Sequence, residues 1–316
     1  MALPGAGLFA GLVIAVMPAT AQEFPSKPIK IVTAAPGGGS DFIARLLAQG
    51  ISGPLGQPVV IENRGTGMLA GEVAARAPAD GYNLTVQGGA FWVGPLLRKA
   101  PYDPIRDFTP VSLIVREVNV LAVNPNLPVQ SLGELIAYAK ANPGKLNYSS
   151  PGVGSTTHLA TELLNSMAGT RMVHVPYQGN QRAIAGVMAG EVHLAIFDAG
   201  LLAPFIQSGK LRALGSTSLD PSPLAPGMQT ISAQGLTGFE SIGLTGVLAS
   251  GKAPPAIVNR INQEIVRYIN RPEVKELFLK SGVELVGSTP EQFAQAMRDD
   301  IAKMGKLITD LKLKIE

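Results

Sequence analysis

Short β-branched runs and amphipathic segments alternate along most of this chain. The run at 29–34 (IKIVTA) is typical of a buried strand, and a glycine-rich stretch ends it. From Ser40 and Asp41 onward, apolar residues recur at helical spacing as far as Ile51, which predicts a helix with one buried face. Further strands are expected at 59–61, 82–86, 111–115, 118–123, 146–149, 172–175, 192–197, 211–215 and 242–248. Such alternation is typical of parallel sheets covered by helices.

The pattern divides the chain into two α/β units and a helical end. The units cover about 25–122 and 125–240. The helices of the final part are expected at about 254–270, 272–281 and 289–312. We expect the strand at 242–248 to rejoin the first sheet, which gives two lobes with crossing connections and a cleft between them.

The first segment is interpreted as an export signal. Residues 1–21 carry no charge, and the apolar stretch 8–17 is too short for a bilayer, which needs about 20 residues. The A-T-A pattern at 19–21 fits a signal-peptidase site, so we expect cleavage after Ala21. The chain has no cysteine, which suits an oxidising compartment, and we expect a periplasmic location.

Composition excludes several kinds of chemistry. The absence of cysteine rules out disulfides, thiolate metal sites and a cysteine nucleophile, and three histidines leave little material for a metal centre. The net charge of +3 comes from 26 basic and 23 acidic residues without a basic cluster. We therefore expect no metal and no nucleic-acid partner.

Two glycine-rich loops have the composition of anion-binding sites. The segment 36–41 (PGGGSD) follows the first strand, and 152–158 (GVGSTTH) follows the strand at 146–149. Glycines allow close approach of backbone N–H groups, and each following helix directs its positive end to the same place. Since ligands bind at the carboxyl ends of strands in open α/β sheets, one such loop in each lobe predicts a site for a small carboxylate. The alternative is that both loops are β–α turns with helix caps.

A third loop, at Gly88, Gly89 and Ala90, precedes Phe91 and the only tryptophan, Trp92. If these rings line the pocket, an aromatic acid is the expected ligand. The alternative is that both rings pack in the core.

A hydrolase is the competing interpretation of the polar residues. Ser155, His158 and Asp198 are the residue types of a nucleophile–base–acid set, although no G-x-S-x-G or H-E-x-x-H motif is present. Asp198 follows the strand at 192–197 and is expected either to bind ligand or to cap the next helix.

The whole chain from about residue 24 resembles a known family. The segments KPIKIVTAAPGGGSDFIAR, ENRGTG, APADGY, PYDPIRDFTPVSLI, HVPYQG, AGEVHLAIFD, SGKLRALGSTS and GSTPEQF occur in this order. They resemble the periplasmic substrate-binding proteins of tripartite tricarboxylate transporters, also called TctC or Bug proteins.

The resemblance implies a type II periplasmic-binding-protein fold, an α/β architecture of two lobes with a ligand cleft and a hinge. Residues 22–124 and 241–316 are then expected to form lobe 1, and 125–240 lobe 2. It further implies a protein that has no catalytic activity and needs no cofactor, and we expect a monomer. Such a protein captures a small carboxylate, namely a dicarboxylate, tricarboxylate, amino acid or aromatic acid, and delivers it to the transporter's membrane subunits. A ligand sensor for a signalling partner is the alternative role.

Ligand contacts are implied by the same resemblance in each lobe. In lobe 1 they fall on Gly37, Gly38, Gly39, Ser40, Asp41, Gly88, Gly89 and Ala90. In lobe 2 they fall on Ser149, Gly154, Ser155, Thr156, His158, Tyr177 and Asp198.

Overall fold

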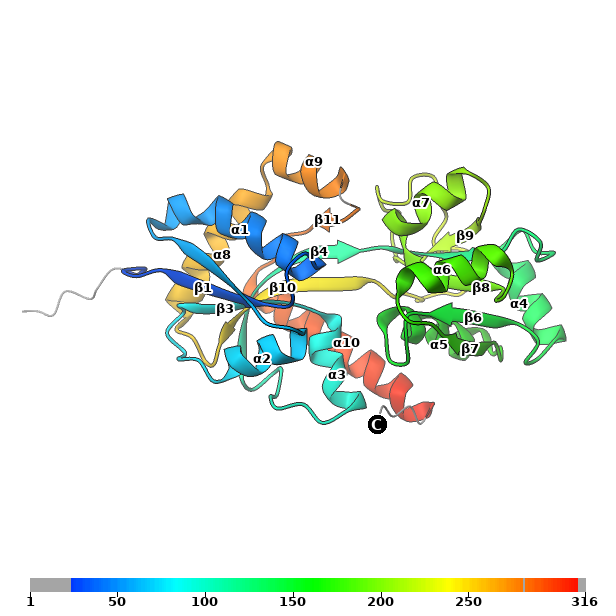
Figure 1. Cartoon of the computed structure of the whole chain (residues 1–316), viewed down its shortest axis with the longest axis horizontal. Helices are drawn as coiled ribbons and strands as arrows, with labels where there is room; N and C mark the ends of the chain where they lie inside the picture. Colours follow the sequence, from blue (N-terminus) through cyan, green and yellow to red (C-terminus); the bar gives the residue numbers. More distant parts are fainter. Residues whose placement is uncertain (1–23, 281, 312–316) are drawn as a thin grey trace, which may run out of the picture.

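The chain folds into two α/β lobes that lie side by side, each built around its own sheet (Figure 1). The computed structural model describes residues 24–280 and 282–311, so the expected signal segment and its cleavage site lie outside the described residues. Within these ranges no helix combines the length and the apolar character that a membrane span requires.

Lobe 1 contains a six-stranded sheet in the order β11-β4-β10-β3-β1-β2. Its strands are β1 (Ile29–Thr33), β2 (Val59–Asn63), β3 (Asn83–Gly88), β4 (Phe108–Glu117), β10 (Gly243–Ser250) and β11 (Glu284–Leu285). Its helices are α1 (Gly39–Leu55), α2 (Gly67–Ala75), α3 (Gly89–Leu97), α8 (Pro255–Ile269), α9 (Pro272–Lys280) and α10 (Pro290–Asp310). Strand β1 is parallel to β2 and β3, whereas β10 runs antiparallel between β3 and β4. The prediction that the strand after residue 240 rejoins the first sheet is therefore confirmed.

Lobe 2 repeats this plan with a five-stranded sheet in the order β7-β6-β8-β5-β9. Its strands are β5 (Asn119–Val123), β6 (Asn147–Ser150), β7 (Val173–Pro176), β8 (Leu194–Asp198) and β9 (Arg212–Ser216). Its helices are α4 (Leu132–Ala141), α5 (Thr156–Ala168), α6 (Asn180–Ala189) and α7 (Ala199–Gln207). Parallel pairs join β6 to β7 and β8, and β5 runs antiparallel between β8 and β9.

The boundary between the lobes differs from the one expected at 124. Strand β5 pairs only with β8 and β9, so it belongs to the second sheet and the first crossing falls at Val118. Sequence could not show this, because β4 and β5 are equally apolar and only their pairing partners distinguish them.

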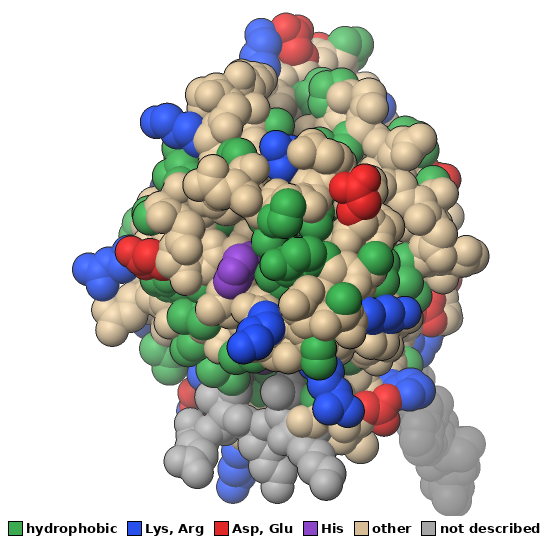
Figure 2. All heavy atoms as spheres, turned by 90° about the vertical axis from the view of Figure 1, so that its right-hand side faces the viewer, with side chains coloured by type: hydrophobic (Ala, Val, Ile, Leu, Met, Phe, Trp, Pro, Cys, Tyr) green, Lys and Arg blue, Asp and Glu red, His purple; other side chains and the backbone are tan. Residues whose placement is uncertain are grey.

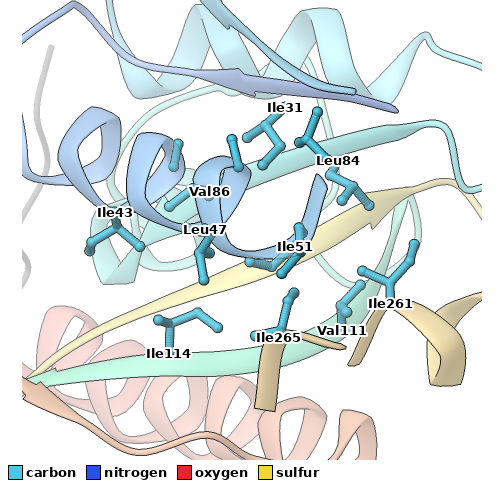
Figure 3. Packing of buried hydrophobic residues seen from close by; sticks show 14 of the residues in the cluster. Ile31, Ile43, Leu47, Ile51, Leu84, Val86, Val111, Ile114, Ile261 and Ile265 are labelled. Carbon is cyan, nitrogen blue, oxygen red and sulfur yellow. The ribbon is translucent and has the colours of Figure 1, made fainter. Parts of the chain in front are cut away.

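The core of lobe 1 explains why these segments form strands and helices. Apolar side chains of α1, spaced three to four residues apart, pack on the buried strands from one face (Figure 3). Helix α8 covers the same face, and Ile261 and Ile265 complete this layer. A second cluster, with Phe91, Trp92 and Phe293, fills the opposite face beneath α3 and α10. With both faces covered, the ends of the strands are the part of the sheet left for a ligand.

Three connections join the lobes. The chain crosses at Val118 and returns through Ser241. Thr217, which donates its N–H to Asn119 just after the first crossing, accepts the N–H of Ser241 on its carbonyl at 2.9 Å and so joins the two crossings. Asn119 reinforces the tie by donating its side-chain amide to the Ser241 carbonyl at 3.2 Å. In addition, α10 of lobe 1 packs on α5 of lobe 2, where Leu159 shares an apolar cluster with Met304. Paired crossing strands of this kind are where two lobes move relative to one another.

The outer end of lobe 2 carries basic and acidic side chains mixed with polar and apolar ones (Figure 2). This face therefore presents no extended field of one sign, the feature that marks nucleic-acid surfaces.

Candidate ligand-binding site

A cavity of about 430 Å³ lies between the lobes, close to the crossing strands. It is walled by the start of α3, the loop before α5, the returning crossing strand and the middle of α10. Its lining residues are Gly89, Ala90, Val93, Gly94, Leu97, Arg98, Pro151, Gly152, Val153, Gly154, Ser155, Thr156, Leu159, Ser241, Ile242, Gly243, Leu244, Asp300 and Met304. This volume is in the range of sites for small molecules, and most of the lining side chains are aliphatic.

Lobe 2 contributes the N-terminal end of α5 to this cavity. The helix begins here because Ser155 caps it, accepting the N–H of His158 on its hydroxyl and donating that hydroxyl to Gly152. Positive φ values at Gly152 and Gly154 allow the preceding loop to turn sharply into the helix. The N–H groups of Thr156 and Thr157 lie in the first turn, where no intrahelical acceptor exists. The cavity therefore meets the positive end of a helix with free donors.

Lobe 1 contributes the start of α3, and here a carboxylate is already in place. A Cβ atom built on Gly89 would lie 3.5 Å from Oδ2 of Asp300, which comes from α10. The same Oδ2 accepts the indole N–H of Trp92 at 2.7 Å. Burial raises the pKa of Asp300, while the Trp92 hydrogen bond and the charge of Lys303 lower it.

The tryptophan itself does not face the cavity. Trp92 is 1% exposed and packs edge-on against Phe293, and Phe91 stacks on Tyr102. Both rings belong to the core, so of the two alternatives for Phe91 and Trp92 the structure shows core packing. The expectation of an aromatic acid loses its support.

The first glycine loop lies at the carboxyl end of β1, apart from this cavity. Gly37 and Gly38 lead into α1, which begins with Gly39 and Ser40 and whose N-terminal end lies on the side of lobe 1 that faces lobe 2 (Figure 1). Asp41 is buried and turned back into its own lobe.

Asp41 holds this loop in shape. Its carboxylate accepts the N–H of Gly37 at 2.9 Å, the guanidinium of Arg45 at 3.0 Å and the side-chain amide of Asn63 at 2.7 Å. The hydrogen bond from Arg45 is the largest cause that lowers the pKa of Asp41 to about 2. A carboxylate with this many donors is an internal clamp for the loop.

His158 holds the loop before α5 in place through a hydrogen bond. Its Nδ1 accepts the N–H of Gly154 at 3.1 Å, and its ring lies 4.0 Å from that of His174. Burial, followed by the neighbouring His174, lowers the pKa of His158 to about 4. His158 is thus a neutral acceptor that positions Gly154, and it does not line the cavity.

Three further residues implied by the resemblance make contacts within their own lobe. Ser149 is fully buried and donates to the Ala183 carbonyl, and the Tyr177 hydroxyl donates to Glu191 at 3.0 Å. Asp198 caps α7 by accepting the N–H groups of the next turn. Gly88 is the N-cap residue of α3, directly before the lining residue Gly89. The 15 implied residues thus divide into five that line the cavity (Gly89, Ala90, Gly154, Ser155 and Thr156) and ten that lie outside it.

Asp198 also faces a second acid at the crossing. Burial raises the pKa of Glu117 to about 7, and the charge of Asp198 adds to this effect. Glu117 pairs in register with Gly243, which leaves room for its side chain because a Cβ there would lie 2.5 Å from the Glu117 carboxylate.

The hydrolase set is not assembled. The Ser155 hydroxyl donates to Gly152, the His158 ring accepts from Gly154 and Asp198 accepts from Gly200, so these three side chains form no relay. Among residues 24–280 and 282–311, no group of three or more metal-ligating side chains is found.

Sequence reasoning missed several lining residues. Arg98 and Asp300 are the charged groups of the cavity, and the segment 241–244, which leads into β10, forms one wall. Arg98 lies just beyond α3, a helix that was not predicted. Asp300 lies on a predicted helix, yet only the packing of α10 on α3 and α5 brings it to the cavity.

The two lobes, the paired crossings and a cavity between them define a binding protein of the periplasmic-binding-protein class. Residues 43–313 match the model described as "Tripartite tricarboxylate transporter family receptor". The chain therefore belongs to the TctC family of periplasmic solute-binding receptors, whose members are not enzymes. This confirms the resemblance and the expected fold class.

Individual relatives are similar to this chain over nearly their full length. A UPF0065 protein from the tcbD–tcbE intergenic region of Pseudomonas sp. (strain P51) is 35% identical, with 92% of this chain and 88% of that protein covered. A solved R. palustris protein with adipate is 32% identical, with a TM-score of 0.74 and coverage of 91% of this chain and 98% of that chain. MatC from Rhodopseudomonas palustris, with bound malate, is 27% identical, with a TM-score of 0.71 and coverage of 90% and 100%.

Proposed function

We propose that this protein captures a small aliphatic carboxylate in the cavity between α3 and α5 and delivers it to the membrane subunits of a tripartite transporter. The observation that carries the proposal is the open N-terminal end of α5, which meets a mostly aliphatic cavity of about 430 Å³. Two solved relatives are described with adipate and with bound malate, both aliphatic dicarboxylates.

The physical basis is recognition by partial charges. A ligand carboxylate placed at α5 accepts from the N–H groups of Thr156 and Thr157 and interacts favourably with the helix dipole. Each charge-assisted hydrogen bond of this kind is worth about 1.5–3 kcal/mol. The aliphatic walls then exclude water from the methylene groups of the ligand, and remaining gaps are filled by bound water.

Lobe movement completes the site. The loop at Gly37–Asp41 lies at the N-terminal end of α1, on the side of lobe 1 that faces lobe 2 (Figure 1). Rotation about the crossings at Val118 and Ser241 brings this loop towards the ligand, which then bridges both lobes. Closure explains how residues outside the present cavity take part in binding.

Membership of this family supports the following route to the membrane. A receptor exported by the segment 1–21 and cleaved after Ala21 meets its ligand in the periplasm as a monomer. The closed, loaded form is then the form that the membrane subunits recognise, because only closure distinguishes it from the empty receptor.

The first test is a single substitution that removes one donor. Thr156 is exposed and is the first residue of α5, a position that tolerates proline, and Ser155 already has the extended backbone that precedes proline well. Thr156→Pro therefore deletes the N–H group and leaves the helix in place. We expect at least a tenfold loss of affinity for the best-binding acid, measured by calorimetry after a thermal-shift screen of aliphatic acids.

The matched control is Thr156→Ala, which keeps the N–H group and loses only the hydroxyl. It should bind within about threefold of the parent protein. Equal affinity of Thr156→Pro and Thr156→Ala, with both correctly folded, would show that the acid does not bind at α5.

A further inference from the structure

The cavity carries two charged side chains of opposite sign, and one of them is unusual in a receptor for acids. Among the lining residues these are Arg98 and Asp300. A carboxylate in the wall repels the second carboxylate of a dicarboxylic ligand, and this repulsion is strong because the cavity is partly shielded from water. A carboxylate in this position instead favours a ligand that carries a positive charge.

Asp300 is held rigidly. Trp92, fixed in the core against Phe293, donates its indole N–H to Oδ2 at 2.7 Å. Among the described residues Oδ1 has no hydrogen-bond partner, so this oxygen remains available to a ligand. A donor from the core therefore orients one oxygen and leaves the other free for recognition.

The basic side chain whose charge acts on Asp300 is itself bound to another residue. Lys303, whose charge lowers the pKa of Asp300, donates to the carbonyl of Glu240 at 3.2 Å and lies 3.6 Å from the Glu240 carboxylate. Asp299, next along α10, is exposed, and its carboxylate accepts from Gln295. Within the described residues no ion pair to Asp300 is formed.

Asp300 also changes what the α3 end can bind. Its Oδ2 lies 3.5 Å from the position of a Cβ on Gly89, the first residue of α3, so a negative charge already stands near the positive end of this helix. Of the two helix N-terminal ends at the cavity, that of α5 is open to a ligand carboxylate, whereas that of α3 already has the Asp300 carboxylate close to it. The α5 end of the cavity therefore carries a positive partial charge, and the α3 end carries the negative charge of Asp300.

We propose that Asp300 is the specificity-determining residue of this receptor and makes it prefer acids that bear an ammonium group over dicarboxylates of the same length. The inference rests on the proposed function, since it places the ligand carboxylate at α5. The ammonium group then donates to Oδ1 of Asp300, and the aliphatic walls hold the chain between the two charges.

Matched ligand pairs test this inference. The pairs are adipate with 6-aminohexanoate, glutarate with 5-aminopentanoate, succinate with aspartate, and glutarate with glutamate, titrated by calorimetry at pH 7.5. We expect the best amino acid to bind at least tenfold more tightly than its dicarboxylate partner. In Asp300→Asn, which keeps an oxygen for Trp92, this preference should fall to threefold or less while the dicarboxylates bind at least as well as before.

Asp299→Asn is the control for a charge lost from the same helix, and it should keep the parent preference. Dicarboxylates that bind as tightly as amino acids in the parent, or an Asp300→Asn variant that keeps the preference, would overturn the role of Asp300. If Thr156→Pro still weakens every acid in that case, the proposed function stands alone. If neither ligand class binds the parent protein, the proposed function fails and this inference fails with it.

Discussion

Several single side chains around this cavity hold its loops and helix ends in shape. Asp41 clamps the loop before α1, and His158 holds Gly154 at the start of α5. Asp198 caps α7 instead of entering the cavity. Each of these side chains contacts the backbone of a loop or helix end and lies outside the cavity, so it shapes the site without lining it.

His158 provides a pH-dependent test of this role. Its pKa of about 4 in the folded chain lies below the ordinary 6.5, so the unfolded chain binds more protons between these values. Stability should therefore fall as the pH decreases from 6.5 towards 4. In His158→Asn, the amide oxygen replaces Nδ1 as the acceptor for Gly154 and does not titrate, so the melting temperature should depend less on pH in this window.

Melting curves of both proteins across pH 4–7.5 make the comparison, with His193→Gln as the control because His193 lies outside the stacked pair. Parallel curves for the parent and His158→Asn would contradict the neutral-acceptor role of His158.

At the scale of helices and strands, sequence patterns predict some elements correctly and miss others. The run at 29–34 and the helical spacing after Ser40 became β1 and α1 because both bury one continuous apolar set. Helix α3 was missed because Gly89, Gly94 and Pro95 are poor helix formers. It forms nevertheless, since Phe91 and Trp92 anchor it in the core. Arg98 was missed together with this helix.

Close packing of helices gives a second prediction. A Cβ atom on Gly50 of α1 would lie 2.3 Å from the Tyr268 ring of α8, so Gly50→Ala forces the two helices apart. We expect a loss of about 1–3 kcal/mol in the free energy of unfolding, measured with urea. Gly133→Ala in α4 is the control, because the nearest atom to its Cβ is 4.0 Å away and the site is exposed.

The control should be neutral or more stable by up to about 1 kcal/mol, since alanine favours the helix. If both variants had the same stability, the close approach of α1 to α8 would be refuted.

The whole molecule depends on contacts between segments that lie far apart in the sequence. Two glycine loops were correctly placed at strand ends, yet only the α5 loop lines the cavity, together with the start of α3. Asp300 enters from α10, more than 200 residues from its hydrogen-bond partner Trp92. No local sequence pattern predicts this contact between Asp300 and Trp92, because it depends on how α10 packs across both lobes. Local composition pointed to a carboxylate site at the start of α5, but only the folded chain shows that Asp300 lies in the opposite wall of the cavity.

A crystal structure of the protein saturated with its tightest-binding acid decides where recognition takes place. We predict one ligand carboxylate within hydrogen-bond distance of the Thr156 N–H group, with the rest of the ligand between α3 and α5. A ligand bound elsewhere, with no contact to residues 154–156, would contradict the account.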